Sequence, residues 1–216
     1  MLIAAVPTMN INRAKGIIAS LLQNAPSPDK IIILNNSSNS LDSSKDNVLI
    51  ANFKQNIGVN AAWNYAMQQA REEEAHLMLL NDDIKIKRNF VGKTLKLLQN
   101  NNVAVACPLT TNNLRIFHKE VIEPENISLW YNLMQKREGW AFTISSQALM
   151  KVPPIPEELF IFFGDDWIWH HTGQWVQDET NIIYHAVGET MRENPPLRQL
   201  LNKERRVWRR LMAKNE

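Results

Sequence analysis

Two pairs of adjacent aspartates and one late histidine are the side chains of this sequence best suited to chemistry. The first pair, Asp82-Asp83, follows the apolar run 76–80 and Asn81. Two acids at the end of a buried strand favour a hard divalent cation, which prefers oxygen ligands. Asn and Asp are also common where strands turn. Taken alone, this pair therefore predicts either a metal site or a capped turn.

The second pair, Asp165-Asp166, follows the aromatic run 160–163 and Gly164. Apolar surroundings raise the pKa of a carboxyl group by desolvation, as a general base near neutral pH requires. The same acids could instead cap a helix over 167–171. His185 could join Asp83 as a metal ligand and leave positions for a diphosphate and water, although a single histidine late in a strand is more often structural.

The elements that must position these residues alternate between strands and helices in the first half of the chain. We expect helices capped by Asn12, following Gly58, and over 89–98, between strands at 2–6, 30–34, 48–51, 76–80 and 103–107. This order is typical of a doubly wound, largely parallel sheet. Such sheets bind ligands at the carboxyl ends of their strands. The polar loops expected there suit a nucleotide better than an apolar ligand.

The second half of the chain has a weaker pattern. Strands are expected near 114–118, 129–133, 139–145 and 176–186, and Ser146 is expected to cap a short helix over 147–151. Pro195-Pro196 opens a final helix. One face of this helix is apolar, and the other carries the basic residues Arg198, Arg205, Arg206, Arg209 and Arg210.

Length and composition predict a single soluble domain with a basic tail. The chain has 216 residues, 44% of them hydrophobic, and a net charge of +2. Residues 191–216 hold eight basic and three acidic side chains, which leaves −3 for the first 190 residues. No apolar run approaches the roughly 20 residues of a membrane helix. With no basic leader at the N-terminus and one cysteine, we expect a cytoplasmic protein, in the host cytoplasm if viral.

The order of the motifs resembles that of family 2 nucleotide-sugar glycosyltransferases, which have the GT-A fold. The resemblance covers residues 2–190 and rests on Pro7–Asn10, Asn35–Ser38, Asn56–Asn64, Leu79–Asp83, Gly139–Phe142, Phe163–Asp166 and His185. It implies a single α/β domain at 1–190, with a Rossmann-like, mostly parallel central sheet flanked by helices. Residues 191–216 would then form a basic amphipathic C-terminal helix.

The resemblance also implies roles for individual residues. The nucleotide-sugar donor, expected to be a UDP-sugar, would contact Pro7, Thr8, Asn10, Asn35, Ser38, Asn56, Gly58, Asn64, Asn81 and Asp82. Asp83 would be the direct ligand of Mn²⁺ or Mg²⁺, assisted by His185. Asp166, beside Asp165, would be the base of an inverting transfer to an acceptor hydroxyl. Three aromatic residues would contact the acceptor: Trp140, Phe163 and Trp167.

The acceptor implied by the resemblance is a glycan or, as in some bacteriophage enzymes, a hydroxymethylated DNA base. The basic final helix would suit contact with a DNA backbone, and it would also suit an acidic membrane surface. Two other classes stay open. A nucleotidyltransferase normally carries a Gly-rich basic loop after its first strand, and Pro7–Asn10 has neither glycine nor lysine. A non-catalytic nucleotide-sugar-binding module stays open because Ile168 replaces an acid common in the family.

Overall fold

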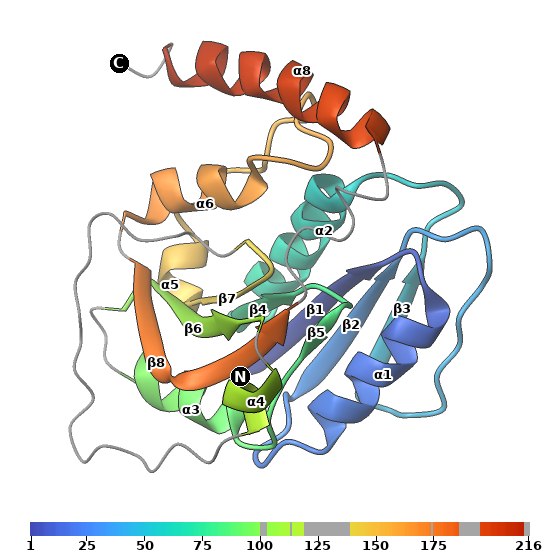
Figure 1. The fold of residues 1–216 in the computed structure, drawn as a ribbon, viewed down its shortest axis with the longest axis vertical. Coiled ribbons are helices and arrows are strands. Elements are labelled where there is room, and N and C mark those ends of the chain that lie inside the picture. The colour runs from blue at the N-terminus through green and yellow to red at the C-terminus, as the bar shows by residue number, and fades with distance from the viewer. Residues whose placement is uncertain (100–102, 113, 119–138, 174, 186–194, 214–216) are drawn as a thin grey trace.

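The fold is built around one curled sheet of eight strands (Figure 1). The computed structural model describes residues 1–216 except 100–102, 113, 119–138, 174, 186–194 and 214–216. The strand order is β3-β2-β1-β4-β7-β6-β8-β5. The strands are β1 (Leu2–Thr8), β2 (Lys30–Asn35), β3 (Val48–Asn52), β4 (His76–Leu80), β5 (Ile84–Lys85), β6 (Val105–Thr111), β7 (Ala141–Ile144) and β8 (Trp175–His185).

Helices cover both faces of the sheet. They are α1 (Ile11–Leu22), α2 (Val59–Glu72), α3 (Phe90–Leu98), α4 (Leu114–His118), α5 (Ser146–Leu149), α6 (Gly164–Thr172) and α8 (Pro195–Met212). Helices α1 and α3 pack on one face, and α2, α5 and α6 on the other. Helix α8 lies beyond α6, above the end of α2 in Figure 1. The result is the GT-A-like α/β domain that the sequence predicts.

The sheet has a parallel half and a mixed half. Strands β3, β2, β1 and β4 are parallel neighbours, so their carboxyl ends share one edge. Strand β7 then pairs antiparallel with both β4 and β6, and β6 pairs parallel with β8. The two-residue β5 pairs antiparallel with the end of β8, with Ile84 opposite His185. This last pairing brings the end of β8 next to the residues that follow β4.

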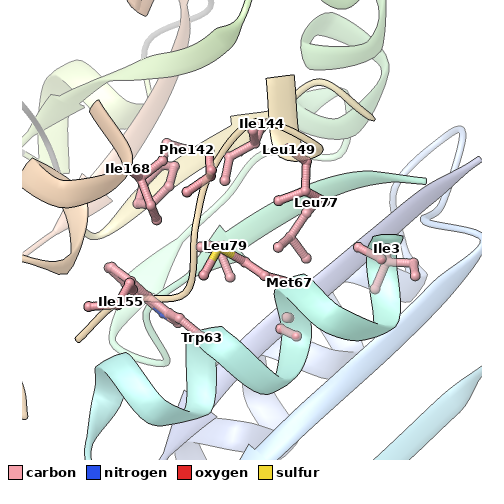
Figure 2. Packing of buried hydrophobic residues seen from close by; sticks show 14 of the residues in the cluster. Ile3, Trp63, Met67, Leu77, Leu79, Phe142, Ile144, Leu149, Ile155 and Ile168 are labelled. Atoms are coloured by element: carbon pink, nitrogen blue, oxygen red, sulfur yellow. The ribbon is translucent and has the colours of Figure 1, made fainter. Parts of the chain in front are cut away.

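The central strands are buried on both faces, as their continuous apolar sequences predict. Because side chains alternate along a strand, Ile3 and Ala5 face α2, whereas Leu2, Ala4 and Val6 face α1 and α3. Figure 2 shows the first of these layers: Trp63 and Met67 of α2 pack against side chains of the sheet that include Leu77, Leu79, Phe142 and Ile144.

Two helix caps differ from the prediction. Asn10, not Asn12, caps α1, because its side chain accepts hydrogen bonds from the backbone amides of Asn12 and Arg13. Ser145, not Ser146, caps α5 through a bond from the amide of Ala148. In each case two neighbouring residues are competent caps. The path of the chain out of the preceding strand decides between them.

The region after β6 also differs from the prediction. Residues 114–118 form helix α4 instead of a strand, and Phe117 is buried against Tyr184 of β8. Strand β6 begins at Val105, two residues later than predicted. The short β5 was not predicted, and the expected strand at 129–133 lies outside the described residues. Among the helices described, none is long and apolar enough to span a membrane.

Candidate active site

Polar residues meet at the edge where the parallel strands end. The hydroxyl group of Thr8, at the end of β1, donates a 2.6 Å hydrogen bond to Oδ2 of Asp82, which follows β4. Burial raises the pKa of Asp82 above its usual value; the bond from Thr8 lowers it, and the charge of Asp83 raises it further. The structure therefore brings together two of the stretches predicted to contact the donor, 7–10 and 81–82.

The loop after β2 joins the same edge through its own side chains. Asn35 is fully buried, and its amide group is bound to Asn52, Ser37 and the carbonyl oxygen of Asn39. Asn36, which was not predicted as a site residue, accepts a bond from the amide of Ile57. Asn35 therefore shapes the loop, while Ser38 is exposed on it.

The stretch 56–64 contributes the start of α2. Asn56 accepts a hydrogen bond from the amide of Gly58, and its Nδ2 lies 3.5 Å from Sδ of Met9, beside the β1 loop. Gly58 has a φ of 84°, and a Cβ atom there would lie 2.3 Å from the carbonyl oxygen of Phe160. Asn64, further along α2, binds the backbone of Ile155 with both polar atoms of its side-chain amide.

Asp83 and His185 form the candidate metal centre. The β5–β8 pairing places Nε2 of His185 3.3 Å from Oδ1 of Asp83. The contact lacks hydrogen-bond alignment, and Oδ1 of Asp83 and Nδ1 of His185 are buried without any hydrogen-bond partner. Burial is the largest influence on the pKa of Asp83 and raises it, but His185, the backbone and the charge of Arg13 together outweigh burial, so the pKa lies below its usual value.

This pair fits a divalent cation. Two ligands about 2.1 Å from one octahedral ion lie about 3 Å apart, close to the 3.3 Å separation of Asp83 and His185. The carboxylate oxygen suits Mg²⁺ or Mn²⁺, and the imidazole nitrogen suits transition metals, so the pair favours Mn²⁺ over Mg²⁺. Within the described part of the chain, no cluster of three or more His, Cys, Asp or Glu side chains could hold a metal. The remaining ligands would then come from the donor diphosphate and water.

Trp140 covers the histidine of this pair. Its ring stacks on His185 with centroids 4.8 Å apart, and its Nε1 donates a 2.7 Å hydrogen bond to Thr110. The backbone carbonyl of Trp140 also accepts a bond from the amide of Asn81. Trp140, predicted to contact the acceptor, thus orients His185 in this structure. A tryptophan followed directly by an apolar strand gave no signal for this role.

The second acid pair lies in the first turn of α6. Asp165 and Asp166 follow Phe163, which has a left-handed φ of 64°, and Gly164. Carboxylates are favoured at this end of a helix, where backbone amides are unpaired. Asp165 approaches Gly139 so closely that a Cβ atom there would lie 2.5 Å from its Oδ2. The Gly139-Trp140 dipeptide therefore lies between the acid pair and His185.

The two other predicted acceptor residues pack against the C-terminal helix. Phe163 stacks on Trp208 of α8 with centroids 5.8 Å apart, and the buried Trp167 donates a bond to the carbonyl oxygen of Pro153. Two residues missed by the prediction, Asn60 and Glu204, bind the backbone at 159–162. A signal existed for Glu204, because it interrupts the apolar stripe of the final helix.

Comparison with known proteins agrees with the fold described above. The family model for glycosyl transferase family 2 matches residues 4–151, and no curated protein sequence matches the chain significantly. Among solved structures, S. aureus TarS 1–349 superposes with a TM-score of 0.62 at 14% identity, over 85% of this chain and 60% of that one. GalNAc-T7 with UDP, GalNAc and Mn²⁺ gives a TM-score of 0.59 at 11% identity, over 86% and 43%.

The TarS fragment has also been solved with UDP-GlcNAc, and that structure gives a TM-score of 0.60 at 14% identity, over 85% of this chain and 57% of that one. This chain thus spans 60% or less of each of these structures. From the family model, which covers more than half of its length, the chain belongs to glycosyl transferase family 2.

Proposed function

We propose that this protein is a metal-dependent glycosyltransferase that moves a sugar from a UDP-sugar to an acceptor hydroxyl group with inversion. The observation that carries the proposal is the Asp83–His185 pair, whose buried polar atoms lack hydrogen bonds at the edge where donor-side loops meet. Family membership supports it, as do similar folds solved with UDP, UDP-GlcNAc and Mn²⁺.

Asp83 and His185 would hold Mn²⁺ or Mg²⁺. A divalent ion there supplies positive charge opposite the diphosphate that departs with the nucleoside. Asp82, which is held in place by a hydrogen bond from Thr8, would lie beside the metal ion without binding it directly. The donor nucleoside would lie along Pro7–Asn10, Asn35–Ser38 and Asn56–Gly58, which contact one another through Asn36 and Met9.

Asp166 would remove the proton from the acceptor hydroxyl. The oxygen then bonds to the anomeric carbon from the face opposite the diphosphate, while the bond from that carbon to the phosphate oxygen breaks. The proton stays on the Asp166 carboxylate, and the electron pair leaves with the nucleoside diphosphate. Asp165 lies against Gly139 in the same turn, so we assign it to shaping the site beside the base.

For the acceptor, the exposed basic face of α8 favours a polyanion. Arg198, Lys203, Arg205, Arg206, Arg209 and Arg210 are all exposed, on a helix that packs beside α6. A DNA duplex carrying a hydroxymethylated base would bind such a face through its phosphates, and the target base would leave the stack to reach Asp166. A neutral glycan acceptor would gain nothing from the basic face of α8.

A thermal-shift screen of nucleotide sugars, with and without Mn²⁺, tests the proposal. A ligand present at 100 times its Kd stabilises the folded state by about 2.7 kcal/mol. We expect UDP-sugars to raise the melting temperature only with the metal, and the best donor to be hydrolysed slowly. Stabilisation without hydrolysis would favour a binding module, and stabilisation by nucleoside triphosphates alone would favour a nucleotidyltransferase.

A further inference from the structure

The segment 159–163, which leads into the acid pair, is held on one side by α2. The side-chain Nδ2 of Asn60 donates 3.0 Å hydrogen bonds to the carbonyl oxygens of Leu159 and Phe162. The backbone amide of Asn60 also points to the carbonyl oxygen of Phe160, 3.3 Å away. The start of α2 therefore binds the carbonyl groups of this segment.

On its other side the same segment is held by the C-terminal helix. Glu204 of α8 is 1% exposed, and its carboxylate accepts hydrogen bonds from the amides of Ile161 and Phe162 at 3.2 and 2.8 Å. One turn further along α8, the ring of Trp208 stacks on that of Phe163. Helix α8 therefore binds the amide groups of a segment whose carbonyl groups are bound by α2.

An acid is an unexpected choice for the position of Glu204. Leu200, Leu201, Trp208 and Leu211 continue the same stripe at helical spacing, and all are at least partly buried. Burying a carboxylate is unfavourable unless hydrogen bonds compensate for its lost hydration. Within the described part of the chain, the hydrogen bonds to the Glu204 carboxylate come from the amides of Ile161 and Phe162. A leucine could pack at this position but could not accept hydrogen bonds from the amides of Ile161 and Phe162.

The segment also carries local strain where it meets α6. Phe163 adopts a left-handed φ of 64°, which a residue with a side chain rarely does without support from its surroundings. Asp165 and Asp166 follow within three residues, in the first turn of the helix. Any change in the path of 161–163 would therefore redirect both carboxylates.

We infer that Glu204 is a positioning residue: by holding the amides of Ile161 and Phe162, it fixes where α6 begins and therefore where Asp165 and Asp166 lie relative to the donor edge. The inference rests on the proposed function for its catalytic meaning. By this inference, helix α8 forms part of the site that binds the acceptor. An acceptor bound to the outer arginines of α8 would then lie on the helix that sets the position of the base.

The test compares Glu204→Ala and Glu204→Gln with a matched control, Glu158→Gln. Glu158 also links this region to α8, through a 3.4 Å contact with Arg210, but both of these side chains are more than half exposed. The change in charge is the same for both glutamine variants. Hydrogen exchange would be followed in peptides covering 159–169, with α2 as the internal reference. Hydrolysis of UDP-GlcNAc with Mn²⁺ would give kcat and KM.

We expect Glu204→Ala to speed exchange in 159–169 and to lower kcat at least tenfold, with KM and UDP binding within twofold of the wild type. Glu204→Gln keeps one acceptor oxygen and should restore part of both losses, and Glu158→Gln should match the wild type. If the alanine variant does not fold, the glutamine variant carries the test. Unchanged exchange and kcat in the Glu204 variants would overturn the inference, whereas a wild type that binds no UDP with Mn²⁺ would instead contradict the proposed function.

Discussion

The adjacent aspartates Asp82 and Asp83 have surroundings that shift their pKa values in opposite directions. Burial raises the pKa of Asp82 despite the hydrogen bond from Thr8, which lowers it, whereas the contact with His185 helps to lower the pKa of Asp83. The residue with the lowered pKa is the better metal ligand, because it keeps its negative charge to a lower pH. The division of roles between the two acids thus follows from their neighbours.

The opposite shifts predict opposite effects of neutralising each acid in metal-free protein. Because the pKa of Asp82 is higher in the folded state than in the unfolded chain, ionisation of Asp82 destabilises the fold. Asp82→Asn should therefore raise the melting temperature at pH 7. This gain should vanish as the pH falls to about 3.9, the unfolded value. Ionised Asp83 stabilises the folded protein when the pH is above the pKa of Asp83 in the unfolded chain. This stability is lost as the pH falls through the lower pKa of the folded state. Asp83→Asn should therefore lower the melting temperature at pH 7. Thermal scans in EDTA from pH 4 to 8 measure both, and shifts of the same sign at pH 7 would contradict the assignment.

At the level of single residues, the sequence predicts the acids better than their partners. Asp83 and Asp166 stand out because each follows an apolar run, and a local pattern is enough to find them. That His185 lies beside Asp83 depends on the pairing of a two-residue strand, β5, with β8, which no local pattern contains. The residue types alone suggested His185 as a possible partner of Asp83, and the resemblance to a family then supported that pairing. Glu204 was missed because a charged residue on a basic helix reads as solvent-exposed.

Among the elements, α2 depends most strongly on one residue at its start. Gly58 has a left-handed φ, and its Cα lies against the carbonyl oxygen of Phe160. The contact joins the donor-side loop 56–58 to the segment that leads to the acid pair. Gly58 therefore serves both the start of the helix and the approach of two chain segments.

Replacing Gly58 by alanine should destabilise the protein markedly. The backbone at Gly58, with φ 84° and ψ 164°, is a conformation adopted almost only by glycine and costs an L-residue about 1–3 kcal/mol. The clash with the backbone at 2.3 Å adds to this. With about 2–4 °C per kcal/mol for a chain of this size, the melting temperature should fall by roughly 2–12 °C or more. Calorimetry measures the shift.

Gly16 offers the matched control for this substitution. It lies inside α1 with no atom within 4 Å of an added Cβ. Gly16→Ala should therefore stabilise the helix by about 0.5–1 kcal/mol. Equal effects of the two substitutions would show that the close approach of Phe160 to Gly58 does not matter.

Element prediction succeeded where apolar runs end sharply and failed where tertiary contacts decide. The strands β1, β2 and β4 were found because each is a buried apolar run bounded by polar residues. Residues 114–118 were taken as a strand, but Phe117 packs on β8 as part of a helix. The caps of α1 and α5 were misplaced by one or two residues, because Asn10 and Asn12, like Ser145 and Ser146, are equally suited by type.

On the scale of the whole molecule, α8 has a docked face and a charged face. Glu204 and Trp208 pack towards α6, while the arginines face solvent. The division of the chain into a domain at 1–190 and a separate helix stays a prediction. The docked face favours treating α8 as part of the same structural unit, and the charged face favours an anionic partner.

If that partner is DNA, binding should depend steeply on salt and on the outer arginines. The logarithm of the binding constant should fall against the logarithm of salt concentration by about 0.9 per phosphate contact. Arg205→Gln with Arg209→Gln should make this slope shallower by up to about 1.8. Fluorescence anisotropy with a 20-base-pair duplex measures it.

The control for the DNA measurement removes two positive charges elsewhere. Lys15 on α1 and Lys96 on α3 are exposed on helices that pack on the other face of the sheet. Changing both to glutamine should leave the slope unchanged. No binding by the wild type at low salt would exclude duplex DNA as the acceptor and leave a glycan.

The central claim is that Asp83 holds a metal for the donor while Asp166 serves the acceptor. Calorimetric titration of UDP into the protein, with and without Mn²⁺, tests it most directly in the wild type, Asp83→Asn and Asp166→Asn. We expect Mn²⁺-dependent UDP binding in the wild type and in Asp166→Asn, and at least tenfold weaker binding in Asp83→Asn. UDP binding that Asp83→Asn leaves intact, or that needs no metal, would contradict the claim.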